Sequence, residues 1–395
     1  MNVANTLSLE AAMHQAWDVV VVGAGPAGTL AARELSRSGL KTLLVDRKSF
    51  PRTKICGACL NQRTLSVLRE VNLESLVQQA DPIPIKNLLV NTSRQSVSLN
   101  LPGGIVLSRT RLDEMLLRAA IESGTEFLAR VTATLDDLTD CQERRRVILK
   151  TNDAPEVVVT GRLVVLADGL SNSALQNYPL AKSRSAPESR VGIGGLLVDP
   201  PQDFETGRIY MAVSQAGYVG LVLLEDGNLN IAAALNTGDL KQHDSPAALI
   251  QQILNKARFP ELNQLNEVKW TGTVPLTRGM QKPTLPRTIL CGDAAGYVEP
   301  FTGEGVSSAL TGGLLASSLI SERIAHWDRS AEEEWGRLYH QKIRHRYRWC
   351  SRLARVSRHS IAVELALSAV RIFPWLAQPV ITHLNDPVKP VAINS

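Results

Sequence analysis

Three glycines near the start of the chain have the spacing of a phosphate-binding turn. They are Gly23, Gly25 and Gly28, in the pattern GxGxxG. The first permits a tight turn, the second lets the backbone approach a pyrophosphate, and the third lets a helix pack closely on a strand. Unpaired N–H groups at the start of that helix would bind anionic phosphates. The candidate contacts of this turn are Gly23, Gly25, Pro26, Ala27 and Gly28.

The residues around these glycines form a complete strand–helix–strand pattern. The mostly β-branched run 17–22 predicts a strand buried on both faces, residues 27–37 predict a helix, and residues 41–45 predict a second strand. Asp46 lies 18 residues after Gly28, close to the spacing of a carboxylate that accepts hydrogen bonds from a ribose. A chance glycine-rich loop would not combine these features, so we expect a dinucleotide to bind here.

A second motif lies far downstream. Residues 288–291 predict another buried strand, which ends in Gly-Asp-Ala-Ala at 292–295. Residues 300–305 read Pro-Phe-Thr-Gly-Glu-Gly, and a helix rich in small residues is expected over about 306–324. Taken alone, the aspartate of this motif, Asp293, could be the N-cap of an ordinary strand-to-helix turn.

Together the two motifs resemble those of the para-hydroxybenzoate-hydroxylase-type flavoprotein superfamily, which includes aromatic-ring hydroxylases, flavin-dependent halogenases and geranylgeranyl reductases. The resemblance extends from Trp17 to about Ile324 and implies FAD as the cofactor, with NAD(P)H as its reductant. It implies that Asp293 holds the ribityl chain, and that the backbone at Gly303 and Gly305 approaches the isoalloxazine. The same loop adds two candidates, Pro300 beside the flavin and Val306 as an FAD contact.

The resemblance implies further FAD contacts. Residues 108–113 open an apolar-periodic helix and resemble an R-x-x-L-D segment whose arginine contacts the FAD phosphates, which makes Arg109 a candidate. The alternative is a solvated charge at a helix start. Residues 163–169 resemble an A-D-G-x-x-S fingerprint that places Asp168 beneath the nucleotide, although Asn172 stands where the serine is expected. Two more candidate FAD contacts are Arg47 and Val131.

The loop at 50–60 is chemically distinctive. Its P-R-x-K-x-C-G stretch resembles that of geranylgeranyl reductases, where it borders the flavin ring, so Cys56 and Gly57 are flavin-proximal candidates. Cys56 and Cys59 could form a redox pair, but thioredoxin-like pairs belong to the N-terminus of a helix in a different unit. We expect these cysteines to pack against the flavin. The other cysteines, interpreted as structural, are Cys141, Cys291 and Cys350.

Composition limits the class of protein. The chain has 395 residues, with 44% apolar and 21% charged residues, which is typical of a globular protein with two domains or a discontinuous second one. Its formal charge of +5 is too small to indicate nucleic-acid binding. Five irregularly spaced cysteines exclude a secreted disulfide scaffold and offer no second pair for zinc, so we expect no metal and a cytoplasmic location.

No run approaches the roughly 20 apolar residues of a membrane-spanning helix. The first sixteen residues also lack the apolar core of a signal peptide. The nearest run, 361–381, is interrupted by Glu364, Arg371 and Pro374. We interpret it as an amphipathic packed helix, with peripheral contact to a membrane surface as the alternative.

These patterns predict an α/β fold. We expect an FAD-binding Rossmann-like domain of the glutathione-reductase type 2, formed by residues 15–84, 102–175 and 285–330. An inserted antiparallel β-sheet substrate domain is expected over 85–101 and 176–284, and a helical C-terminal segment over 331–395. The strands expected in the insertion are 190–197, 208–213, 218–224, 229–235 and 268–276.

The function expected first is an NAD(P)H-dependent monooxygenase that hydroxylates a hydrophobic or phenolic small molecule, such as a polyketide-derived one. No His, Asp or Glu stands out as a general base. One alternative is a geranylgeranyl-reductase-like enzyme that saturates isoprenoid double bonds, favoured by the 50–60 loop. The other is a flavin-binding protein without turnover. The halogenase segment W-x-W-x-I-P does not occur in this sequence.

Overall fold

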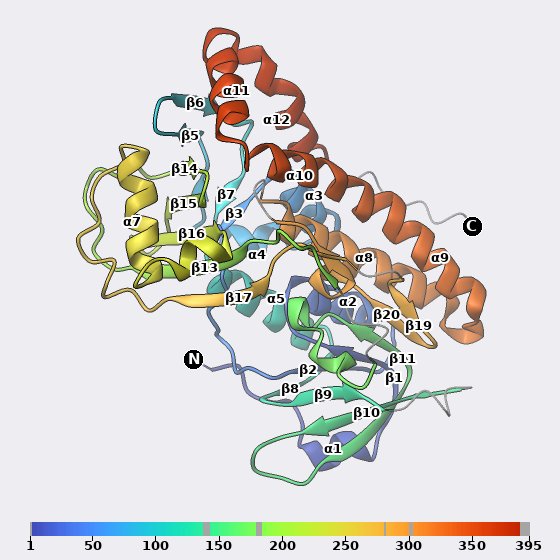
Figure 1. The fold of residues 1–395 in the computed structure, drawn as a ribbon. Coiled ribbons are helices and arrows are strands. Elements are labelled where there is room, and N and C mark those ends of the chain that lie inside the picture. Colours follow the sequence, from blue (N-terminus) through green and yellow to red (C-terminus); the bar gives the residue numbers. More distant parts are fainter. Residues whose placement is uncertain (1, 137–142, 179–183, 280–281, 300–302, 388–395) are drawn as a thin grey trace.

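The computed structural model describes residues 2–136, 143–178, 184–279, 282–299 and 303–387. Its largest sheet has eight strands and contains the βαβ unit expected from the glycine motif (Figure 1). Strands β20, β11, β1, β2 and β8 are parallel in that order, β19 pairs antiparallel with β20, and β9 and β10 extend β11 as antiparallel strands. The strands are β1 (Ala16–Val22), β2 (Thr42–Asp46), β8 (Glu126–Ala129), β9 (Thr132–Leu135), β10 (Arg145–Lys150), β11 (Val157–Leu166), β19 (Thr284–Leu285) and β20 (Thr288–Leu290).

Helix α2 (Pro26–Arg37) follows β1 and packs between α5 (Arg109–Glu122) and α8 (Glu304–Arg323). Small residues allow the close approach of α2 and α8. A Cβ atom on Gly313 would lie 2.3 Å from the carbonyl oxygen of Ala27, so the backbones of the two helices are nearly in contact. The shared core joins these helices to the valine-rich β1 strand, whose residues Val19, Val20 and Val21 are fully buried.

A second sheet has seven strands in the order β17-β13-β16-β15-β14-β5-β6. The strands expected from the sequence are present, but one pair differs from the antiparallel expectation: β5 and β14 are parallel. Because β5 and β6 come from an earlier part of the chain, they join the sheet at its edge without a hairpin link to β14. The bounds are β5 (Asn87–Asn91), β6 (Ser96–Asn100), β13 (Val191–Leu197), β14 (Arg208–Ser214), β15 (Gly217–Leu223), β16 (Leu229–Leu235) and β17 (Thr271–Pro275).

The two faces of this second sheet pack differently. Tyr210 and Ala212 of β14 belong to a cluster with α7 (Pro246–Lys256), which covers one face. Their neighbours Ile209 and Met211 line a cavity on the other face, since successive side chains of a strand point to opposite sides. The smaller elements are α1 (Leu9–Met13), α3 (Gln62–Glu70), α4 (Glu74–Gln78), α6 (Thr237–Lys241), β3 (Cys59–Leu60), β4 (Ile83–Pro84), β7 (Ile105–Val106), β12 (Arg184–Ser185), β18 (Arg278–Gly279) and β21 (Gly296–Tyr297).

The C-terminal part is helical, as expected. Helices α9 (Arg329–Tyr339) and α10 (His345–Val356) run along the molecule towards the second sheet, where α11 (Ser360–Ile372) lies beside β6 (Figure 1). Helix α12 (Gln378–Asn385) contacts α3. The single packed helix expected over 361–381 is wrong. Pro374 begins a short 3-10 turn between α11 and α12, and none of the α11 side chains is fully buried. No helix among the described residues is long and apolar enough to span a bilayer.

Candidate functional site

One large cavity, of about 1300 Å³, lies between the eight-stranded sheet and the second sheet. Small-molecule pockets usually have about 300–1,000 Å³, so this cavity has room for a dinucleotide and part of a second molecule. It brings together residues from both glycine motifs and from the 50–60 loop. The sequence-predicted residues that line it are Gly25, Pro26, Ala27, Cys56, Gly57, Arg109, Asp293, Gly303, Gly305 and Val306.

The other candidates are placed differently. Five of them belong to the walls behind the cavity or to its outer rim and do not line it in the described structure: Gly23, Gly28, Asp46, Val131 and Asp168. Arg47 is exposed and lines a smaller hollow together with Lys48 and Arg130. Pro300 lies outside the described residues.

The three glycines of the turn have distinct surroundings. Gly23 has φ +103°, and a Cβ atom there would lie 2.4 Å from the carbonyl oxygen of Ala167. A Cβ on Gly28 would lie 1.9 Å from the carbonyl oxygen of Gly23. Gly25 faces the cavity, and its nearest neighbour would be Arg52 Nη2 at 3.6 Å. The packing therefore requires Gly23 and Gly28, whereas Gly25 leaves open space in front of the N-terminus of α2.

Asp46 is a buried carboxylate at the end of β2. It accepts hydrogen bonds from the backbone N–H groups of Ala24 and Lys48, both at 2.8 Å. Val131 donates its backbone N–H to the Asp46 carbonyl oxygen at 3.0 Å. These contacts fix the acid next to the glycine turn.

Two arginines supply positive charge beside the turn. Arg109 binds Asp113 in a bidentate manner, with both N–O distances at 2.8 Å. Arg52 Nη1 lies 3.1 Å from the Asp46 carboxylate, and its Nη2 lies 3.6 Å from the Asp113 carboxylate. Burial is the largest single effect and lowers the pKa of Arg109, but Asp113, Cys56 and Asp293 together raise it by more. The net pKa is therefore raised and the guanidinium stays charged. Arg52 was missed as a candidate, although it lies in the distinctive loop.

Asp168 supports the turn from behind. It accepts hydrogen bonds from Ala174 N at 2.9 Å and from the Ser173 hydroxyl at 3.1 Å. Burial raises the pKa of its carboxyl group. Asn172, which departs from the expected serine, donates from Nδ2 to the carbonyl oxygen of Ala294 at 2.8 Å. The second fingerprint thus joins the Gly-Asp-Ala-Ala segment to the first βαβ unit.

The second motif lies beside the start of α2, because a Cβ atom on Gly292 would lie 2.9 Å from the Cβ of Ala27. Asp293 follows β20 in a short 3-10 turn, and its carboxylate lies 3.5 Å from Lys54 Nζ. Gly303, with φ +69°, is the N-cap of α8. A Cβ atom on Gly305 would lie 3.5 Å from the ring of Tyr297. The start of α8 therefore faces the cavity with its backbone.

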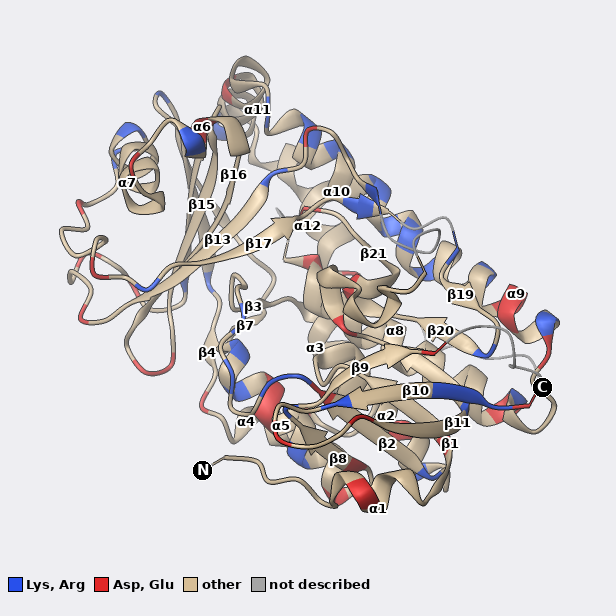
Figure 2. Cartoon of the chain, turned by 60° about the horizontal axis from the view of Figure 1, so that its bottom comes forward, with Lys and Arg blue, Asp and Glu red and all other residues tan. Residues whose placement is uncertain are grey.

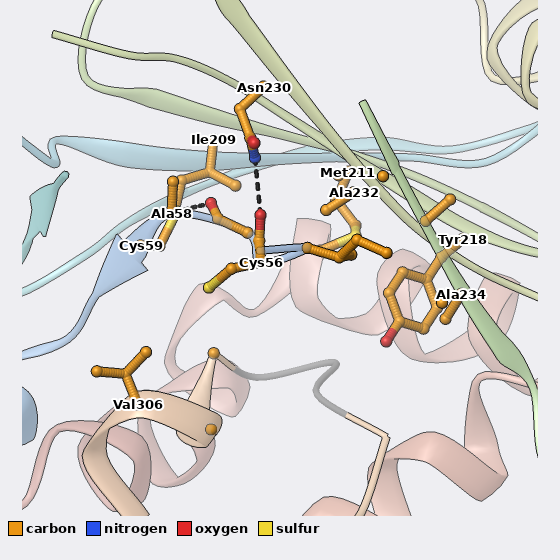
Figure 3. A pocket seen from close by; sticks show the side chains of 18 of the residues that line it. Cys56, Ala58, Cys59, Ile209, Met211, Tyr218, Asn230, Ala232, Ala234 and Val306 are labelled. Atoms are coloured by element: carbon orange, nitrogen blue, oxygen red, sulfur yellow. Dashed lines mark hydrogen bonds between the residues drawn. The ribbon is translucent and has the colours of Figure 1, made fainter. Parts of the chain in front are cut away.

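The 50–60 loop crosses the cavity between α8 and the second sheet (Figure 3). Asn230 Nδ2 donates to the carbonyl oxygen of Cys56 at 2.9 Å, and Cys59 Sγ donates to the carbonyl oxygen of Gly57 at 3.1 Å. Both cysteines are free thiols. Burial, followed by the neighbouring Cys56, raises the pKa of Cys59 from 9.0 to about 12. Cys59 is therefore a poor thiolate at neutral pH.

The second sheet provides an apolar roof, on which Met211, Ala232 and Ala234 face the loop (Figure 3). Tyr218 and Asn230 are polar residues of this roof. Burial, followed by Glu299, raises the pKa of the Tyr218 hydroxyl well above the ordinary value. The hydroxyl of Tyr297, which also lines the cavity, has a raised pKa from burial and from Asp293. The cavity wall is thus mainly apolar, and the hydroxyl groups of Tyr218 and Tyr297 keep their protons.

The residues present fit FAD. Gly25 leaves open space where a pyrophosphate would approach, and Arg52 and Arg109 supply charge next to it. No side chain among the described residues caps α2 or α8, so the first N–H groups of both helices are available to an anionic or electron-rich ligand. Within the same residues, no group of His, Cys, Asp or Glu is arranged to hold a metal ion.

Comparisons with known proteins agree with this geometry. The two sheets, the glycine turn and the cavity between them define the chain as an FAD-dependent oxidoreductase. The chain belongs to the FAD binding domain family, whose model matches residues 16–336.

Three curated relatives match most of the chain. Menaquinone reductase of Mycobacterium tuberculosis is 28% identical over 354 residues, which cover 81% of each chain. Digeranylgeranylglycerophospholipid reductase of Methanosarcina acetivorans is 25% identical, with 81% of this chain and 79% of the relative covered. Conditioned medium factor receptor 1 of Dictyostelium discoideum is 25% identical over 80% of this chain, which spans only 65% of that relative's length.

Solved structures share the fold. The flavin-dependent brominase Bmp2 has a TM-score of 0.78 at 18% identity, with 94% of each chain covered. A geranylgeranyl bacteriochlorophyll reductase-like protein of Thermoplasma acidophilum has a TM-score of 0.72 at 18% identity, with 93% of this chain and 99% of the other covered. The α/β fold class expected from the sequence, with its FAD-binding unit, second sheet and helical C-terminus, is confirmed.

Proposed function

We propose that this oxidoreductase saturates carbon–carbon double bonds in a long apolar substrate of the isoprenoid type, with NAD(P)H as the source of electrons. The observation that carries the proposal is the extent of the apolar cavity. It continues beyond the 50–60 loop, under β14 and β15, to α11 and α12. An extended hydrocarbon chain matches a passage of this length and lining better than a compact phenol does. Two relatives that are named as reductases support the same proposal.

FAD, when bound and reduced by NAD(P)H, would supply the hydride for one carbon of the double bond, and a proton from the protein would be added to the other carbon. In this proposal Arg52, Arg109 and the N-terminus of α2 bind the pyrophosphate, and Asp293 orients the ribityl chain. The apolar roof excludes water from the reacting carbons. Tyr218 or Tyr297 holds the proton, because both hydroxyls line the cavity and have raised pKa values.

The monooxygenase expected from the sequence is the second candidate. An apolar, water-poor cavity also suits insertion of oxygen into a hydrophobic or phenolic molecule. The reductase is the first candidate because the apolar cavity extends to α11 and α12, and two relatives that are named as reductases support it. A flavin-binding protein without turnover is the third candidate.

Anaerobic turnover separates the three candidates. The FAD-loaded protein, reduced in advance, is mixed with detergent-dispersed geranylgeranyl lipid or menaquinone, and the return of oxidised-flavin absorbance is followed together with the product mass. We expect reoxidation without oxygen and a product that gains one H₂ per double bond. A product that gains an oxygen atom, and only in the presence of O₂, would assign the monooxygenase. If no product formed either with or without O₂, the protein would be assigned as a flavin-binding protein without turnover.

A matched pair of variants tests the passage itself. Leu367 of α11 lines the cavity, whereas Leu365 of the same helix is 66% exposed. Leu367→Trp should lower turnover of the long substrate by about tenfold or more, because the indole fills the passage, an overpacking of the kind that costs ~1–3 kcal/mol. Leu365→Trp adds the same bulk on the outer face and should leave turnover in detergent unchanged. Equal activity of both variants would contradict the passage.

A further inference from the structure

Helix α11 is apolar on two opposite sides. The side facing the cavity carries Val363, Leu367 and Val370. The opposite side carries Ile361, Leu365 and Ile372, which are exposed by 75%, 66% and 65%. At 3.6 residues per turn the two sets lie about half a turn apart. A helix of a globular protein normally presents one apolar stripe to the core and polar residues to water, so the outer side of α11 lacks its expected polar cover.

The exposed apolar surface continues into the turn after α11. Phe373 and Trp375 are exposed by 51% and 66%. We call this surface the α11 patch: Ile361, Leu365, Ile372, Phe373, Trp375 and Leu376. Among the described residues twelve large apolar side chains are exposed, and six of them fall within residues 361–376. Such a concentration marks an interaction surface, whereas singly scattered apolar residues do not.

Positive charge gathers on the neighbouring helix. Residues 340–386 hold eight of the 43 Lys and Arg and only two of the 38 Asp and Glu, so the rest of the chain is close to neutral. Four exposed arginines follow the spacing i, i+4, i+8 and i+11 and therefore share one side of the helix leading to α11. Figure 2 shows basic segments gathered along this helix. None of the four pairs with a carboxylate in the part of the chain that the structure describes. This α10 stripe consists of Arg344, Arg348, Arg352 and Arg355.

The cavity reaches the surface next to the α11 patch. Val356, at the end of α10, and Leu376, in the turn after α11, both line the cavity. They are also exposed by 44% and 39%. One opening of the cavity therefore lies where the basic helix meets the apolar patch.

We propose that the α11 patch and the α10 stripe dock this protein on the surface of an anionic lipid membrane, with the opening at Val356 and Leu376 turned towards the lipid. Exposed apolar and aromatic residues next to arginines are the features of helices that lie in a membrane interface. Anionic headgroups would attract the stripe. A symmetric pairing of two copies through the same surface would bring two basic segments together, which like-charge repulsion disfavours.

Docking in this orientation gives the cavity a source of substrate. A lipid with an apolar tail could pass from the bilayer into the opening without crossing water, which spares it the cost of hydrating the tail. Only this last step rests on the function proposed above. The docking itself depends on the patch, the stripe and their positions.

Vesicle sedimentation with the full-length, FAD-loaded protein tests the docking. The vesicles are phosphatidylcholine alone or phosphatidylcholine mixed with phosphatidylglycerol. We expect sedimentation with the anionic vesicles, much less with the neutral ones, and weakening by salt. Phe373→Ser combined with Trp375→Ser should abolish binding. Arg348→Gln and Arg352→Gln should each weaken binding to anionic vesicles by about fivefold. Val198, which is 58% exposed but outside the patch, is the control, and Val198→Ser should bind like the original protein.

The vesicle sedimentation of each variant is interpreted together with its folding and its oligomeric state. FAD content and light scattering establish that each variant is folded and report its mass. Equal sedimentation of the Phe373/Trp375 variant and the Val198 control would overturn the proposal. A dimer that the Phe373/Trp375 changes convert to a monomer, without vesicle binding by either, would overturn it in favour of a second copy.

Failure of the docking and failure of the proposed function are distinguishable. Reduction of a detergent-dispersed substrate by a protein that binds no vesicles would overturn the docking alone. Vesicle binding by a protein that reduces no double bond would support the docking and contradict the reductase.

Discussion

Arg52 Nη1 lies 3.1 Å from the carboxylate of Asp46, the acid at the end of β2. The same guanidinium reaches Asp113 of α5 with Nη2 at 3.6 Å and lies over the open side of Gly25. One side chain therefore joins Asp46, which we propose binds the ribose, to the glycine turn, which we propose binds the pyrophosphate. Because Asp46 and Asp113 already hold it, Arg52 can present its charge to a ligand with little loss of side-chain entropy.

Arg52→Gln should weaken FAD binding by about 1.5–3 kcal/mol, the usual contribution of a hydrogen bond to a charged group. This corresponds to roughly 10- to 150-fold in the dissociation constant. Arg47 is exposed and does not line the large cavity, so Arg47→Gln should change the constant by no more than about threefold, as surface substitutions usually do. Fluorescence titration of the deflavinated protein measures both. A larger effect at Arg47 than at Arg52 would contradict this assignment of the phosphate site.

Gly25→Val should abolish FAD binding while leaving the fold intact. A branched side chain at Gly25 would project into the cavity towards Arg52, into the space needed by a pyrophosphate. The matched control is Gly336, where a Cβ atom would meet nothing within 4 Å. Gly336→Ala should retain the cofactor. For each protein, the bound flavin is released by heating and identified by chromatography. Release of FMN alone from the unmodified protein would contradict FAD as the cofactor.

The glycine turn and β1 could be predicted because their signals are local: a β-branched run, fixed glycine spacing and an acid at the end of the next strand. Arg52 could not, because its role depends on Asp113, which only tertiary folding brings near. The parallel pairing of β5 with β14 and the path of the cavity to α11 join distant segments in the same way. For residues 361–381 the sequence favoured one amphipathic packed helix, with contact to a membrane surface as the alternative, because the sequence does not show which apolar side of α11 faces the cavity and which is exposed.

Asp293→Ala should weaken FAD binding by about 1–3 kcal/mol, the cost of deleting one buried hydrogen-bonding partner. Lys54 lies 3.5 Å from the Asp293 carboxylate and is 37% exposed. Lys54→Met therefore removes the ion pair but keeps the carboxylate, and should have a much smaller effect, since exposed pairs contribute little. Isothermal titration with FAD compares the two. Unchanged affinity in a folded Asp293→Ala protein would show that Asp293 only begins the turn.

Glu299→Gln should destabilise the whole protein more than it affects the cofactor. Glu299 is fully buried and pairs with Arg190, which precedes β13, at 2.9 Å and with Arg358, which follows α10, at 3.3 Å. Removing one partner of a buried ion pair costs about 3–5 kcal/mol because the remaining charge is left uncompensated. Thermal unfolding measures the loss, with the exposed pair Arg329–Glu333 as the control. Glu333→Gln should change stability by no more than about 1 kcal/mol.

Experiments on Cys56 and Cys59 distinguish a packing role of the two thiols from a dithiol redox mechanism. Because the pKa of Cys59 is raised from 9.0 to about 12, its thiol is neutral at pH 8 in the folded protein. Iodoacetamide should then modify Cys59 slowly at that pH until the protein is unfolded. The raised pKa also sets the sign of its contribution to stability. The unfolded chain loses this proton above about pH 9 while the folded chain keeps it up to about pH 12, so stability falls as the pH rises through this range.

Cys59→Ser should therefore keep most NAD(P)H-dependent turnover, because a neutral side chain of nearly the same size preserves the hydrogen bond to the Gly57 carbonyl oxygen. It should also reduce the loss of stability above pH 9. Cys56→Phe should lower turnover by crowding the cavity that Cys56 lines, with Cys56→Ser as its size-matched control. A redox role needs both sulfur atoms. If Cys56→Ser and Cys59→Ser each abolished turnover with FAD still bound, packing would be the wrong explanation and electrons would have to pass through a disulfide.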